Sequence, residues 1–416
     1  MKLIKIKTRG PGPIIDTGWL DISSGITAFS FENQERRDGF GLAIEAINPL
    51  YEIMRRAPFQ LVPGTIISGG YQKKISPSKR TMSFAIFTSD ADLVKALSSL
   101  SPFLFETDRI ETGRRLDYSR WFNFVELASS TRWSEISSHF KAVGSIDAPP
   151  ETLQLLDDLR GADRIKGRSV EILADCLTRN KLRFEKIGID IVELSQKINR
   201  EPHFHQAFKM VAERMPLTTM IGSQPKLSAS YHIRTRDEPC DYDPVLNLLA
   251  YFIRKVGDNG STESATVLGQ CEKLVEETSK RCLVETDFTL RAESGGLKEI
   301  EVVISARQPV TTSRVWSIQL QCAMAQAVSA VLGHYPPLLI YQHAHNIFDQ
   351  QQTQEIWQML DHFATSSQLF YLHDFHSEPP KQAHRIYHES EIALGVSSQE
   401  NTPETDSHLK NHDSVA

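Results

Sequence analysis

A short apolar run near the carboxyl end of the chain stops abruptly at polar residues, and this change constrains the fold most. Leu338–Tyr341 follows two prolines and ends at the polar segment 342–345, QHAH. A second apolar run, Gln368–Leu372, ends at the His-Asp pair 373–374, and an amphipathic helical pattern separates the two runs. Strand, helix and strand in this order indicate an open α/β sheet, which presents polar side chains at the carboxyl ends of its strands.

The first 50 residues predict the other half of such a sheet. Residues 1–31 are typical of two strands around the turn Gly10–Pro13. A polar loop, Glu32 to Asp38, follows, and a helix is expected to start at about Gly39 and to stop before Pro49. We therefore expect strands from the two distant ends of the chain to assemble one sheet.

The middle of the chain predicts smaller elements. Short β-rich segments, Thr65–Ile67, Ser83–Thr88 and Trp121–Leu127, indicate an antiparallel patch, and residues 288–304 read as a hairpin around Glu293-Ser294-Gly295-Gly296. Helices are expected within 150–215, 244–256, 262–280 and 314–332, without a sustained heptad. The predicted organisation is an N-terminal lobe (1–150), a helical insertion or short arm (151–284), a C-terminal lobe (285–395) and a disordered tail (396–416).

Composition excludes several classes of protein. A hydrophobic content of 40% and a charged content of 24% are typical of soluble globular proteins, and no apolar run approaches the ~20 residues of a membrane helix. The N-terminus lacks the apolar core of a signal peptide. Five scattered cysteines without a C-x-x-C pair argue against a disulfide framework and favour the cytoplasm. We expect no membrane association.

The order of these elements resembles the head domain of ABC/SMC/RecF-type ATPases, whose two lobes lie at the ends of the chain with an insertion between them. The resemblance implies an α/β, P-loop NTPase-like head with a mixed sheet assembled from both chain ends, an antiparallel β patch and a helical insertion. In this alignment Gln342 stands where such heads carry a metal-organising Asp, and His343 where they carry the catalytic Glu. Asp349 matches the aspartate that reaches across a head dimer, and His373 matches the switch histidine.

Residues 25–50 resemble the strand, phosphate loop and helix of the same heads, with the degenerate loop at about 31–41. Phe40 occupies the place of the lysine that binds phosphate, and Gly41 that of the hydroxyl that binds Mg²⁺. Arg36 and Arg37 are candidate replacements for the missing cation, and a solvated basic loop is the alternative. The resemblance implies these nucleotide-contacting positions: Asn33, Arg36, Arg37, Gly39, Gly41, Thr311, Asp349 and His373.

Loss of the lysine, the hydroxyl and both acidic residues predicts a pseudo-ATPase, because hydrolysis needs Mg²⁺, a cation on the phosphates and a group that orients water. The expected cofactor is none, or ATP without efficient hydrolysis. Relatives of this type suggest a scaffold subunit in DNA repair, chromosome organisation or defence against phage and plasmids. The expected partners are a second ATPase-type head, in a homodimer or heterodimer, an effector or nuclease subunit, and DNA through the basic pairs 55–56, 73–74 and 114–115.

A histidine-rich C-terminal part supports a different hypothesis. Ten of the fourteen histidines lie in the last 83 residues, and two clusters follow the two apolar strands. Histidine is the commonest metal-binding side chain, so a hydrolase that uses Zn²⁺ or Mn²⁺ is the alternative function. Its ligands would come from His343, His345, His373, Asp374 and His376.

Overall fold

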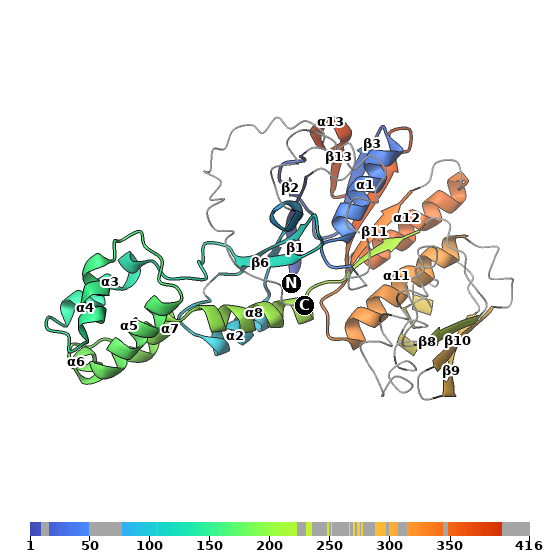
Figure 1. Ribbon diagram of the computed structural model, residues 1–416. Helices are drawn as coiled ribbons and strands as arrows, with labels where there is room; N and C mark the ends of the chain where they lie inside the picture. The colour runs from blue at the N-terminus through green and yellow to red at the C-terminus, as the bar shows by residue number, and fades with distance from the viewer. Residues whose placement is uncertain are drawn as a thin grey trace. The chain divides into compact units, whose positions relative to one another are not determined.

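The computed structural model of the 416-residue chain places most of the sequence (Figure 1). The described residues are 1–9, 16–49, 77–105, 107–222, 230–234, 288–296, 299–306, 314–343 and 348–392, with positions 248, 251, 266, 269, 270, 273, 274, 276 and 277. Several predicted features lie outside them: the turn Gly10–Pro13, the segment Thr65–Ile67, the basic pairs 55–56 and 73–74, Thr311, His345, the tail 396–416 and most of the helices over 244–256 and 262–280.

The chain divides into two compact units. The first contains Met1–Phe87, Thr112–Trp121 and Arg214–Ala416, and the second contains Thr88–Glu111 and Phe122–Glu213. Among the described residues, no helix has both the length and the apolar character needed to cross a bilayer.

The sheet that carries the predicted site belongs to the first unit and has the strand order β13-β3-β12-β11-β7. Its strands are β13 (Arg385–His388), β3 (Ile26–Phe31), β12 (Gln368–Asp374), β11 (Leu338–Gln342) and β7 (Thr218–Ile221). Strand β3 from the amino end pairs with β12 and β13 from the carboxyl end, so the predicted assembly from both chain ends is confirmed. One detail differs: all four pairings are parallel, so the described strands of this sheet are not mixed.

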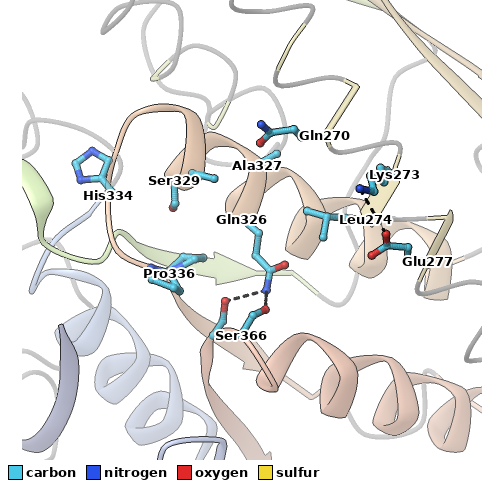
Figure 2. A pocket seen from close by; sticks show the side chains of 13 residues that line it. Gln270, Lys273, Leu274, Glu277, Gln326, Ala327, Ser329, His334, Pro336 and Ser366 are labelled. Carbon is cyan, nitrogen blue, oxygen red and sulfur yellow. Dashed lines mark hydrogen bonds and ion pairs between the residues drawn. The ribbon is translucent and has the colours of Figure 1, made fainter. Parts of the chain in front are cut away.

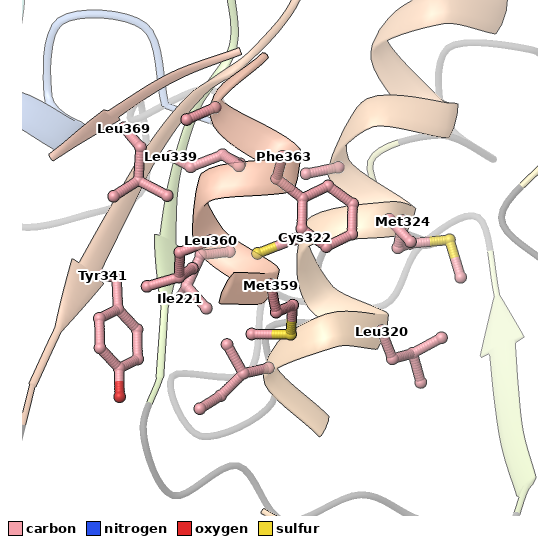
Figure 3. Close-up of a cluster of buried hydrophobic side chains, with 14 of the residues drawn as sticks. Ile221, Leu320, Cys322, Met324, Leu339, Tyr341, Met359, Leu360, Phe363 and Leu369 are labelled. Carbon is pink, nitrogen blue, oxygen red and sulfur yellow. The ribbon is translucent and has the colours of Figure 1, made fainter. Parts of the chain in front are cut away.

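Helices cover this sheet, which explains why its central strands β3, β12 and β11 are buried along almost their whole length. Helix α1 (Gln34–Glu45) contacts β3, β12, β11 and β7. Helices α11 (Arg314–Val331) and α12 (Gln350–Ala364) share a buried cluster with the sheet that includes Leu339, Tyr341, Met359 and Leu360 (Figure 3). Fully burying such a side chain stabilises the fold by about 1.5–3 kcal/mol, so this cluster is a principal source of the rigidity of the sheet.

Two further sheets accompany the parallel one. One has the order β2-β1-β4-β5-β6, formed by β2 (Leu20–Asp21), β1 (Lys2–Thr8), β4 (Thr81–Thr88), β5 (Arg109–Arg115) and β6 (Arg120–Phe124). The other has the order β8-β10-β9, formed by β8 (Ser230–Arg234), β10 (Glu299–Ala306) and β9 (Phe288–Gly296). The antiparallel pairing of β9 with β10 confirms the predicted hairpin, but its predicted turn is wrong, because Glu293–Gly296 is the end of β9 and is paired with β10.

A buried amide links β1 to the parallel sheet. The backbone N–H of Leu3 donates to Gln368 Oε1 at 2.7 Å, and Gln368 Nε2 donates to the carbonyl of Leu3 at 2.8 Å. These two hydrogen bonds satisfy the buried polar side chain of Gln368 at the start of β12. They explain why a glutamine precedes the apolar residues of this strand.

The second unit is mainly helical. Its helices are α2 (Ala91–Leu100), α3 (Trp133–Ala142), α4 (Pro150–Asp158), α5 (Arg168–Arg179), α6 (Lys181–Lys186), α7 (Ile191–Ile198) and most of α8 (Glu201–Arg214). Trp133 and Phe140 of α3 pack in one buried cluster with Leu173 and Phe184. This cluster joins α3 to the helices that follow it, so the helical unit includes residues before 151. The observed division therefore differs from the boundary predicted at 150.

Candidate functional site

The carboxyl ends of the parallel strands bring most of the described site residues to one edge. In register across the sheet, Gln342 lies opposite Leu372, and Leu372 lies opposite Phe29. One residue further on, Ser30 of β3 lies between His373 of β12 and His388 of β13. The predicted adjacency of the two histidine-bearing strands, β11 and β12, is therefore confirmed.

The junction between β3 and α1 differs from the prediction. Strand β3 ends at Phe31 and α1 begins at Gln34, so only Glu32 and Asn33 connect them. The loop predicted over Glu32–Asp38 is therefore wrong, and most of the supposed phosphate loop over 31–41 is the first two turns of a helix. Gly39 and Gly41 lie inside this helix and are buried.

Asn33 explains why the helix begins early. Its Oδ1 accepts hydrogen bonds from the backbone N–H groups of Glu35, at 2.7 Å, and Arg36, at 3.3 Å. Asparagine is a favoured N-cap because its side chain satisfies amides that the helix itself leaves unpaired. These are the amides that would face a phosphate at a helix N-terminus, and here Asn33 occupies them.

The two residues aligned with the phosphate-binding lysine and the Mg²⁺-binding hydroxyl belong to the core. Phe40 has no exposed surface, and its ring centroid lies 4.8 Å from that of Phe29 and 5.4 Å from that of Phe31. A Cβ atom on Gly41 would lie 2.8 Å from Gln342 Nε2 and 3.1 Å from Leu372 Cδ1. The side chain of Gln342 therefore fills the space beside the helix where a hydroxyl would have to stand.

Arg36 and Arg37 are both engaged by other parts of the chain. Arg37 Nη1 donates to the carbonyl of His343 at 2.9 Å and so joins α1 to the end of β11. Arg36 Nη1 forms a charge-assisted hydrogen bond with Glu389. Neither arginine is therefore a purely solvated surface residue, since each makes a hydrogen bond to a distant part of the chain.

Glu389 is a site residue that the sequence reasoning missed. It follows β13 and opens the short helix α13 (Glu389–Ile392), and it is only 6% exposed. Its carboxylate accepts from the backbone N–H of Glu32 as well as from Arg36. No motif marks it, because β13 is four residues long, is mostly exposed and lacks the apolar character of the central strands.

Asp349 has a local structural role. Its side chain accepts from the backbone N–H of Gln352 at 2.8 Å, and Gln352 Oε1 accepts from the N–H of Asp349 at 3.3 Å. This capping box fixes the start of α12. The interface role implied by the resemblance remains a prediction.

The two buried histidines, His343 and His373, both lie close to the ring of Tyr371. The ring centroid of Tyr371 is 5.7 Å from that of His343 and 5.6 Å from that of His373. His373 Nδ1 donates to the carbonyl of Asp374 at 2.9 Å, whereas its Nε2 is buried and has no hydrogen-bond partner among the described residues. Burial lowers the pKa of His373 below its usual value, against the opposing effects of its bond to Asp374 and the charge of Asp374.

Asp374 and His376 shape the turn after β12. Asp374 Oδ1 accepts from the backbone N–H of His376 at 3.1 Å and from Ser377 Oγ at 2.8 Å, while the His376 side chain is exposed. Over the described residues, which do not include His345, no group of three His, Cys, Asp or Glu side chains is arranged to hold a metal ion. The described part of the predicted metal set is thus explained by packing and turn formation.

A cavity of about 480 Å³ lies at the other end of the sheet (Figure 2). It is lined by residues that precede the strands, His334, Pro336 and Pro337 before β11 and Ser366 and Ser367 before β12, and by α11. On its wall Gln326 Nε2 donates to the hydroxyls of Ser366 and Ser367, both at 2.8 Å. None of the predicted site residues lines this cavity.

Comparison with known proteins identifies no family model and no curated protein that matches the chain. Among solved structures, it is similar to an SMC head bound to the C-terminal winged-helix domain of ScpA, with 12% identity, 90% of each chain covered and a TM-score of 0.40. An SMC head from Pyrococcus furiosus, bound to the C-terminal domain of ScpA, has 12% identity, 89% coverage of each chain and a TM-score of 0.36. The recombination mediator RecF has 10% identity, 93% and 95% coverage and a TM-score of 0.41.

At these TM-scores and identities the likenesses transfer no activity, partner or site residue to this chain. The strand pairings provide independent evidence, because they join the two chain ends and make β11 and β12 neighbours, as the sequence resemblance implied. The chain thus has the predicted α/β architecture, with one sheet built from both chain ends and a two-residue junction where a phosphate loop was expected.

Proposed function

We propose that this protein is an ABC/SMC-like head that does not hydrolyse ATP and that acts as a scaffold subunit of a multi-protein complex. The observation that carries the proposal is the two-residue connection between β3 and α1, closed by the side chain of Asn33. A phosphate loop needs a longer stretch of backbone whose amides point at the phosphates. Glu32 and Asn33 are too few to form one.

The side chains around the junction support the same conclusion. Phe40 is buried against two phenylalanines, and Gly41 lies against Gln342, so neither position provides a cation or a hydroxyl for Mg²⁺. Gln342 and His343 offer no carboxylate to organise the metal or to activate water. Removing one transition-state donor typically costs about 2.7–4 kcal/mol, so losing all of these groups leaves little catalytic capacity.

What the chain retains supports a scaffold role. The parallel sheet and its covering helices form an extensive core although the groups for hydrolysis are absent. We propose a second ATPase-type head as its partner, in a homodimer or heterodimer, beside an effector or nuclease subunit and with DNA as a further contact. A cytoplasmic role in DNA repair, chromosome organisation or defence belongs to the same proposal.

Nucleotide assays on the full chain test the first part. We expect no ATP turnover above background and no micromolar binding of Mg-ATP by calorimetry. The double variant Gln342→Asp with His343→Glu, which restores the two acidic residue types, should remain inactive because the β3–α1 junction stays closed. Turnover or micromolar Mg-ATP binding by the wild-type chain would overturn the proposal.

Sedimentation velocity tests the scaffold part. We expect assembly, with itself or with the products of neighbouring genes, to be the same with and without Mg-ATP. An assembly that forms only when Mg-ATP is present would contradict a nucleotide-independent scaffold.

A further inference from the structure

Glu389 brings a buried negative charge to the end of β3, the position at which an α/β sheet commonly binds anions. Strand β13 delivers it there, because its residues Arg385–His388 pair in parallel with Thr27–Ser30. Glu389 is the next residue, and its carboxylate lies against the backbone N–H of Glu32. Glu389 is only 6% exposed, and burying a carboxylate to this extent destabilises the folded protein unless hydrogen bonds and an opposite charge compensate for the lost hydration.

The hydrogen-bond donors around Glu389 form an anion site, and one of these donors is not used by the Glu389 carboxylate. The two carboxylate oxygens accept from Glu32 N–H and from Arg36 Nη1. Arg36 Nε is also buried but has no hydrogen-bond partner within the described part of the chain. A phosphate group carries more acceptor oxygens than a carboxylate, and guanidinium binds it in a two-point fork.

We propose that Glu389 is an internal ligand of this anion site and that a phosphate-bearing ligand competes with it for Glu32 N–H and Arg36. The inference rests on the proposed function, since it explains what occupies the junction in a head that does not use ATP. Binding of the external phosphate requires Glu389 to leave, and the segment of β13 and α13 that carries it moves as well.

The segment that must move is small. Strand β13 has four residues, of which three are exposed, and it lies at the edge of the sheet with β3 as its strand partner. Its main apolar attachments are Tyr387, stacked on Phe29 with ring centroids 5.4 Å apart, and Ile392, which is buried. Short edge elements with few buried contacts open at lower free energy than central strands.

The test is phosphate binding by Glu389→Gln, which keeps the shape of the side chain and removes its charge. Thermal shift and calorimetry of the full chain use inorganic phosphate as the probe. We expect the variant to bind phosphate at least about tenfold more tightly than the wild type, because an internal competitor lowers apparent affinity by the fraction of open sites. Phosphate should raise the melting temperature of the variant much more than that of the wild type.

Glu378→Gln is the matched control, because it removes the same charge from an exposed residue of the neighbouring segment. It should bind phosphate as weakly as the wild type. Adding Arg36→Gln to Glu389→Gln should abolish the gain. If Glu389→Gln binds phosphate no better than the wild type and Glu378→Gln, the inference is wrong.

A measurement on the wild type covers the case in which Glu389→Gln does not fold. Hydrogen exchange of residues 385–392 should increase as inorganic phosphate is added, and unchanged exchange would overturn the inference. Repeating the titration of Glu389→Gln with ATP shows whether the preferred phosphate is free or part of a nucleotide. ATP turnover by the wild type would overturn the proposed function instead, so the two failures are distinct.

Discussion

Replacing Gly41 by alanine tests the closed junction most directly. The new Cβ would lie 2.8 Å from Gln342 Nε2, 3.1 Å from Leu372 Cδ1 and 3.3 Å from Met220 Cε, so three side-chain ends would have to move together. Overpacking of this kind typically costs about 1–3 kcal/mol. Replacing glycine by alanine inside a helix stabilises the helix by about 0.8–1.0 kcal/mol, which offsets part of this cost. We expect Gly41→Ala to lower the free energy of unfolding by about 1 kcal/mol.

The nearest obstacle is Gln342, and its removal should change the sign of the effect. In a Gln342→Ala background the remaining contacts are less tight, so Gly41→Ala should be neutral or slightly stabilising through its helix propensity. The double-mutant cycle should therefore give a coupling free energy of about 1 kcal/mol. Gln358→Ala, an exposed glutamine of α12, is the matched control, and its effect should add to that of Gly41→Ala within about 0.5 kcal/mol.

Urea unfolding followed by tryptophan fluorescence is a suitable assay. Four of the five tryptophans lie in the first unit, and only Trp133 lies in the second, so the signal reports mainly on the unit that contains Gly41. A coupling below about 0.3 kcal/mol, or stabilisation by Gly41→Ala in the wild-type background, would show that Gln342 does not pack against α1 as described.

Two further predictions concern buried side chains of the first unit. Burial lowers the pKa of His373, so the unfolded chain takes up its proton first as the pH falls. The contribution of His373 to the free energy of unfolding is therefore fully present above the unfolded pKa of about 6.5, and it is lost as the pH falls through the lower pKa of the folded state. The melting temperature of His373→Asn should therefore decline less steeply between about pH 7 and 5 than that of the wild type. An equal slope for the two proteins would contradict this prediction. Arg114→Lys should lower the free energy of unfolding by about 2–4 kcal/mol in urea titrations. The Arg114 guanidinium donates to the carbonyl of Ala46 at 2.8 Å, of Ile47 at 3.4 Å and of Tyr118 at 2.7 Å, and a lysine ammonium cannot reproduce this forked arrangement. Arg115→Lys, at the half-buried neighbour, should cost less than about 1 kcal/mol, and equal losses would refute the role of Arg114.

Local patterns in the sequence predicted the elements that bury apolar surface. Leu338–Tyr341 and Leu369–Leu372 are continuous apolar runs, and both lie in strands of the parallel sheet that have a neighbour on each side. The apolar helix over 314–332 and the pairing of two strands over 288–304 were also predicted, because periodicity is a property of neighbouring residues, whereas the turn predicted at Glu293–Gly296 is part of β9. Strand β13 was not visible, since four mostly exposed residues carry no such pattern.

The site was less predictable than the fold, because its contacts join residues far apart in the sequence. The sequence located the edge where Gln342, His343 and His373 lie, and it showed that the acidic residues and the lysine expected there are absent. It did not show that α1 begins at Gln34, since that depends on how Asn33 caps the helix once β3 is fixed in the sheet. Only the tertiary structure brings Glu389 to Arg36, 353 positions earlier, because a carboxylate finds its partner through the register of β13 on β3 and not through any local pattern.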